Sequence, residues 1–61
     1  MNKAQKRQLE MIQAYLANDM RDTAARSISA LIRSATVRSS AQELYRFAVE
    51  HNLHSEPEFI C

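Results

Sequence analysis

The sequence contains no glycine, and it has only one proline and one cysteine among 61 residues. Tight turns, β-bulges and two-residue hairpins depend on residues that adopt positive φ, which glycine does at the lowest steric cost. The absence of glycine therefore argues against an antiparallel sheet and favours an all-α protein. The single cysteine, Cys61, excludes an internal disulfide and suits a reducing compartment.

Long apolar runs are also missing. No stretch approaches the roughly 18 consecutive apolar residues that a membrane-spanning helix needs. The basic cluster of Lys3, Lys6 and Arg7 is followed by polar residues instead of the apolar core of a signal peptide. We therefore expect a cytoplasmic protein that has no membrane partner.

Sequence motifs for catalysis are absent as well. The chain has no glycine-rich phosphate loop and no nucleophile elbow. His51 and His54 have the i, i+3 spacing of two metal ligands, but a structural zinc site normally needs four. We expect no enzymatic activity, no cofactor and no metal.

Apolar residues recur with helical spacing in three segments. In the central segment, residues 22–35, one arc of the helix contains Ala24, Ile28, Leu31, Ile32 and Ala35. Ser29 falls on the opposite, polar side of this helix. We predict helices at about residues 3–18, 20–37 and 41–52, which form a three-helix bundle in a single domain spanning residues 1–61.

Capping residues precede each predicted helix. Asn2 is placed to cap the first helix, and either Asp19 or Asp22 to cap the second. Ser40 and Glu43 have the spacing of a capping box, in which each side chain accepts a hydrogen bond from the other residue's backbone N–H. This box predicts that the third helix begins near residue 41.

The C-terminal segment is predicted to form a short turn or arm. Asn52 suits the end of the third helix, and Leu53 is expected to fold back against it. Phe59 and Ile60 then either pack on the body of the protein or end an acidic arm that crosses to another chain. Both alternatives are compatible with the sequence.

The first helix carries more apolar surface than one core-facing stripe. Leu9, Ile12 and Leu16 share one face, and a second set lies about 120° away and consists of Ala4, Met11 and Tyr15. A chain of this length buries only about 60% of the surface that it exposes when unfolded. The second set is therefore covered by another helix, left half exposed, or used in a subunit interface. Under the last interpretation we predict a homodimer through Met11, Tyr15, Tyr45 and Val49.

Charge is distributed unevenly although the net charge is only +1. Residues 1–38 hold seven basic and three acidic side chains, whereas residues 39–61 hold one basic and four acidic ones. The basic residues Lys3, Arg7, Arg26 and Arg33 could contact a partner protein or the phosphates of a nucleic acid. The outline of a helix-turn-helix also occurs, but Glu43 and Glu50 lie on what would be its recognition helix.

These features favour a small protein-binding adaptor, inhibitor or regulator that acts through a helical, homodimeric surface. The alternative is a small nucleic-acid-binding regulatory protein that uses the basic face of the first two helices.

Overall fold

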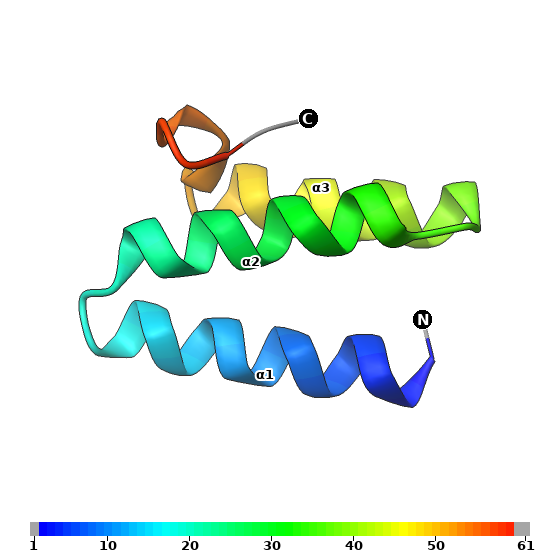
Figure 1. The fold of residues 1–61 in the computed structure, drawn as a ribbon, viewed down its shortest axis with the longest axis horizontal. Coiled ribbons are helices and arrows are strands. Elements are labelled where there is room, and N and C mark those ends of the chain that lie inside the picture. Colours follow the sequence, from blue (N-terminus) through cyan, green and yellow to red (C-terminus); the bar gives the residue numbers. More distant parts are fainter. Residues whose placement is uncertain (1, 60–61) are drawn as a thin grey trace.

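The computed structural model of the protein describes residues 2–59. Its helices are α1 (Lys3–Ala17), α2 (Arg21–Ser34) and α3 (Arg38–Glu50), followed by the short 3-10 helix η1 (Leu53–Ser55). No strand occurs in this part of the chain. The prediction of an all-α, three-helix bundle is confirmed (Figure 1).

α2 occupies the centre of the bundle. It runs antiparallel to α1, and it packs against α3 as well (Figure 1). No α-carbon of α1 comes within 8 Å of an α-carbon of α3. The two outer helices are therefore held in place through α2 rather than by close backbone packing against each other.

The predicted apolar stripes form the core. The fully buried hydrophobic residues of the described chain are Ile12, Ala24, Ala25, Ile28, Leu44, Ala48 and Leu53. Leu9, Leu16, Leu31, Ile32 and Ala35 are partly buried and pack against them, as their helical spacing predicts. Three of the seven fully buried residues are alanines, whose side chains are single methyl groups. α2 can therefore approach its neighbours closely.

Ser29 is buried, with only 1% of its surface exposed to solvent, so its predicted position on the polar side of the second helix was wrong. α2 packs on both α1 and α3, and its buried surface is consequently wider than the stripe expected for a helix with one neighbour. The Ser29 hydroxyl donates to the backbone carbonyl of Arg26 at 2.9 Å. This bond satisfies a polar group that would otherwise be costly to bury.

The start of α1 follows the prediction. The Gln5 backbone N–H donates to Asn2 Oδ1 at 2.8 Å, and the Asn2 backbone N–H donates to Gln5 Oε1 at 3.2 Å. Asn2 therefore caps the helix, and Gln5 completes a reciprocal capping box.

The predicted cap of the second helix was wrong. Met20 occupies the N-cap position of α2 and makes no side-chain cap bond. Asp19 instead adopts a left-handed conformation, with φ of 61°, in the turn that joins α1 to α2. Asp22 lies inside the first turn of α2, where its negative charge complements the helix dipole.

The second helix ends earlier, and the third begins earlier, than predicted. α2 stops at Ser34 rather than near residue 37, and α3 starts at Arg38 rather than near residue 41. The prediction of a capping box formed by Ser40 and Glu43 was wrong, because Ser40 lies within α3 and is buried. Ser40, Leu44 and Ala48 are four residues apart and form the buried stripe of α3, so Ser40 packs inward instead of capping.

The chain beyond α3 folds back on the bundle. Asn52 is left-handed, with φ of 58°, and the following Leu53 is completely buried, as predicted. Arg21 of α2 fastens this segment, because its Nε lies 3.0 Å from Glu56 Oε1 and its Nη2 donates to the Asn52 carbonyl at 2.8 Å. Phe59 also packs against the core. Packing in cis is thus confirmed for residues 53–59, while Ile60 lies outside the described residues.

Candidate functional site

Large apolar side chains remain exposed on α3. Tyr45 and Val49 are each 43% exposed although they are four residues apart on one face of the helix. The buried stripe of α3 lies on a different side, toward α2. The helix therefore has a second apolar face that the described fold does not cover.

This face borders a hollow of about 650 Å³. α3 contributes most of its lining, and α2 contributes one residue; the lining consists of Ile32, Arg38, Ala41, Gln42, Tyr45, Arg46 and Val49. The α3 members form two neighbouring rows with a spacing of four residues, 38–42–46 and 41–45–49, so they share one side of the helix. We call the six residues that α3 contributes the α3 face.

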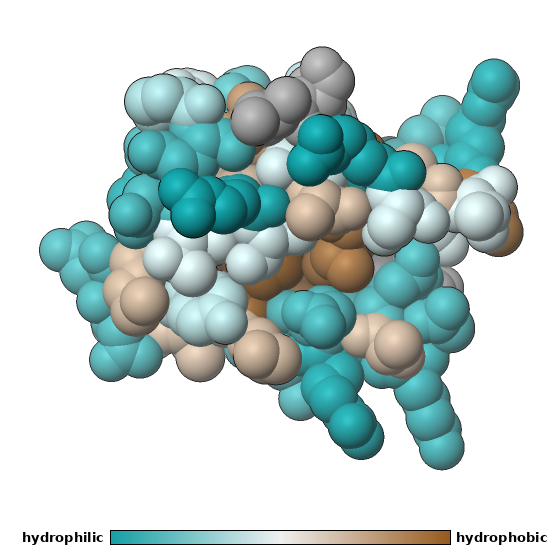
Figure 2. All heavy atoms as spheres, viewed as in Figure 1, coloured by the Kyte–Doolittle hydropathy of each residue, from teal (hydrophilic) through white to brown (hydrophobic). Residues whose placement is uncertain are grey.

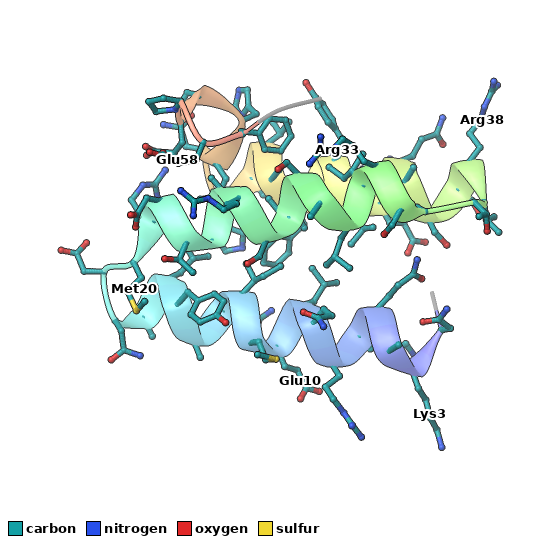
Figure 3. The ribbon with its side chains drawn as sticks, viewed as in Figure 1. Lys3, Glu10, Met20, Arg33, Arg38 and Glu58 are labelled. Atoms are coloured by element: carbon teal, nitrogen blue, oxygen red, sulfur yellow. The ribbon has the colours of Figure 1, made fainter. Side chains whose placement is uncertain are left out.

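The α3 face is basic as well as apolar. Arg38 and Arg46 lie eight residues apart, which corresponds to about 12 Å along a helix, and no acidic side chain lines the hollow between them. Within residues 2–59 the ion pair that forms is the one between Arg21 and Glu56. In Figure 3, Arg38 extends outward from the first turn of α3. Both guanidinium groups are therefore available to carboxylates of another molecule.

Phe59 contacts the α3 face at Tyr45. Its ring meets the ring of Tyr45 edge to face, with 6.1 Å between the centroids and 65° between the planes. Such a contact orients the tyrosine ring while leaving a large part of it in solvent. The C-terminal segment consequently contacts one of the residues that line the hollow.

The residues predicted for self-association are divided between two helices. Tyr45 and Val49 both line the hollow on α3. Met11 is 45% exposed on α1, which does not touch α3 closely, and Tyr15 packs partly against the core. The structure brings together two of the four side chains, and these two belong to the α3 face.

The predicted basic residues are exposed but spread over the molecule. Lys3, Arg7, Arg26 and Arg33 are all exposed to solvent. Figure 3 places Lys3 on the side of α1 that faces away from α2, whereas Arg33 lies at the edge of α2 that borders α3. The bundle thus separates Lys3 and Arg33 instead of joining them in one basic surface.

The two histidines are also placed on the surface. His51 packs its ring on Phe47, with 4.3 Å between the centroids and a tilt of 43°, and His54 is exposed in η1. In the part of the chain that the structure describes, no group of three or more histidine, cysteine or acidic residues gathers as metal ligands do. Stacking on Phe47 is the contact that His51 makes here.

A smaller hollow, of about 360 Å³, lies where α1 meets α2. Its lining is mostly small and polar and consists of Gln8, Ser27, Ala30, Leu31 and Ser34. In Figure 2, hydrophobic residues are visible along the seam between these two helices and are bordered by polar ones. This hollow carries no charged group in its lining and is a less distinctive surface than the α3 face.

Reasoning from the sequence missed five members of the site, which are Ile32, Arg38, Ala41, Gln42 and Arg46. The prediction that the third helix begins near residue 41 left Arg38 outside it, so the full face was not assembled. The signal was present: residues 38, 41, 42, 45, 46 and 49 fall on one side of a helix that begins at Arg38.

Comparison with known proteins found no match to this chain among protein-family models, curated sequences or solved structures. None of the helices in residues 2–59 combines the length and the apolar character needed to cross a membrane.

Proposed function

We propose that this protein acts without catalysis as a small protein-binding adaptor, inhibitor or regulator, and that the α3 face is its binding surface. The observation that carries the proposal is the hollow beside Tyr45 and Val49, flanked by Arg38 and Arg46. Tyrosine and arginine are enriched among the residues that dominate binding energy in protein interfaces. Protein-binding surfaces commonly combine an exposed apolar cluster with a polar or charged rim.

The position of Tyr45 supports this proposal. Its ring is held by the edge-to-face contact with Phe59, so less side-chain entropy is lost when a partner covers it. The side chain still offers 43% of its surface to solvent. A homodimer through this face, as predicted from the sequence, is one form of the proposed activity.

Affinity capture with matched variants tests the proposal. We expect the wild-type protein and Met11→Lys to retain the same bound protein, because Met11 is similarly exposed but lies on α1. The double variant Tyr45→Lys/Val49→Lys should bind it at least about tenfold more weakly, since two interface anchors are lost. Circular dichroism establishes that both variants are folded.

The opposite pattern would contradict the proposal. If Tyr45→Lys/Val49→Lys retains the partner at wild-type strength while Met11→Lys loses it, the binding surface lies on α1 and the α3 face has no part in it.

A further inference from the structure

The α3 face is divided lengthwise into an apolar row and a basic row. The apolar row, which lies next to the buried stripe of the helix, consists of Ala41, Tyr45 and Val49. The basic row, which lies farther from the core, consists of Arg38, Gln42 and Arg46. A partner that fits this surface therefore has apolar side chains along one edge and hydrogen-bond acceptors beside them.

The charge of the basic row is not balanced on the α3 face. Every charged residue that lines the hollow is basic. The residues that follow Arg38 by three and four positions are uncharged. Glu43 and Glu50 lie within one turn of Arg46, but they are on the side of α3 that faces away from Tyr45, and neither lines the hollow. Within residues 2–59 neither arginine of the basic row forms an ion pair, so the face attracts carboxylates.

The spacing of the two arginines fits acidic residues on a helix. Two carboxylates seven or eight positions apart on a partner helix are separated by about 10.5–12 Å along its axis, which matches the separation of Arg38 and Arg46. Apolar residues three and four positions after the first carboxylate lie on the same side of that helix, where they can cover Tyr45 and Val49.

An extended partner segment fits less well. Recognition of an extended segment usually depends on the edge of a sheet, which supplies backbone hydrogen bonds, and residues 2–59 contain no strand. A helical partner needs no such edge because its backbone groups bond to one another. The surface therefore favours a helix laid along α3.

A second copy of this chain does not supply the missing charges through the same face. Two α3 faces in contact would bring together Arg38 and Arg46 of each copy, and no carboxylate of either hollow lining. Like charges that face each other across an interface weaken it. Charge complementarity thus favours a different molecule as the occupant.

We propose that the α3 face binds an acidic amphipathic helix of another protein, whose carboxylates meet Arg38 and Arg46 while its apolar residues cover Tyr45 and Val49. This inference rests on the proposed function, because it names the chemistry of the partner at the same surface. The apolar contacts supply most of the affinity, and the exposed ion pairs supply selectivity for an acidic partner. Arginine suits this role because its planar guanidinium group binds a carboxylate through two hydrogen bonds.

Selection from a displayed library of helical peptides tests the inference. The peptides have about 15 residues in an alanine-rich sequence, and all positions on one side of the helix are randomised. We select those that the wild-type protein retains and Tyr45→Lys/Val49→Lys does not. In these peptides, aspartate or glutamate should occupy two positions seven or eight residues apart at least about tenfold more often than lysine or arginine does.

Charge variants of the protein provide the controls. Arg38→Glu/Arg46→Glu should reverse the preference toward lysine and arginine, and Arg38→Gln/Arg46→Gln should abolish it. Arg7→Glu changes the net charge by as much as the glutamine double variant, but Arg7 is exposed on α1, which lies away from α3. It should leave the preference unchanged. Circular dichroism establishes that each variant is folded.

Three results would overturn the inference while leaving the proposed function in place. The selected peptides could show no preference for acidic residues, or Arg7→Glu could abolish that preference as fully as Arg38→Gln/Arg46→Gln does. Analytical ultracentrifugation could also show a wild-type dimer that Tyr45→Lys/Val49→Lys abolishes, in which case a second copy occupies the face. If no peptide distinguishes the wild type from Tyr45→Lys/Val49→Lys and no such dimer forms, the proposed function fails together with the inference.

Discussion

At the residue scale, two side chains perform the work that glycine performs in most proteins. Asp19 and Asn52 both have positive φ, at 61° and 58°, and they lie where the chain leaves α1 and α3. Asparagine and aspartate reach this region at lower cost than other residues with a Cβ, because their short polar side chains bond locally. The chain thus makes two sharp reversals without any glycine.

Substitution of Asn52 should reveal how much free energy a positive φ still costs a residue that has a Cβ. We expect Asn52→Gly to raise the free energy of unfolding by up to about 1 kcal/mol, and Asn52→Val to lower it by about 1–2 kcal/mol, because a β-branched residue is strained there. Urea denaturation followed by circular dichroism measures both changes. Gln13→Gly is the control: in the middle of α1 glycine should lower the same free energy by about 1 kcal/mol. Equal effects of glycine at the two positions would contradict this account.

Sequence reasoning identified Asn52 and missed the role of Asp19. Aspartate serves equally well as a helix cap and as a left-handed turn residue, and sequence spacing alone does not separate the two. Ser29 was misplaced for another reason, because the burial of a serine depends on how many neighbours its helix has. The conformation or burial of such residues is determined by tertiary contacts rather than by local preference.

At the element scale, helical periodicity predicted all three helices but not all of their ends. The start of α1 was predicted correctly because Asn2 and its partners are local in sequence. The boundary between α2 and α3 was misjudged because Ser40 continues the buried stripe of Leu44 and Ala48. Half of the predicted self-association set, Tyr45 and Val49, does belong to the α3 face, since helical spacing alone places them together.

The segment after α3 is a structural element of the bundle and not an appendage. We expect Leu53→Ala to lower the free energy of unfolding by about 2–5 kcal/mol, because the leucine is completely buried. Thermal and urea denaturation measure this loss. Pro57→Ala, at an exposed position in the same segment, should change stability by no more than about 0.5 kcal/mol. A small effect of Leu53→Ala would mean that the segment does not dock on the bundle.

At the scale of the whole molecule, the arrangement of the helices determines which charges act together. Lys3 and Arg33 lie on separate sides of the bundle, although the sequence allowed them to form one basic face (Figure 3). Arg38 and Arg46, in contrast, flank a single hollow. Residues distant along the chain are brought together or separated by the fold, and a helical wheel does not contain that information.

We therefore expect no retardation of duplex DNA by this protein at about 50 mM salt, because strong electrostatic binding needs many simultaneous phosphate contacts. A mobility-shift series at two salt concentrations is the measurement. A retarded band that weakens steeply with added salt, and that Arg26→Ala/Arg33→Ala abolishes, would contradict the expectation and favour a nucleic-acid partner.

The central position of α2 restricts how the sequence can diverge during evolution. α2 has a neighbour on either flank, and three of its four buried residues, Ala24, Ala25 and Ser29, are small. A larger side chain at any of these positions would push two helices apart, at a cost of about 1–3 kcal/mol in a protein with little stability to lose. Homologues of this chain should therefore keep small residues at positions 24, 25 and 29, while the outward positions of α1 vary freely.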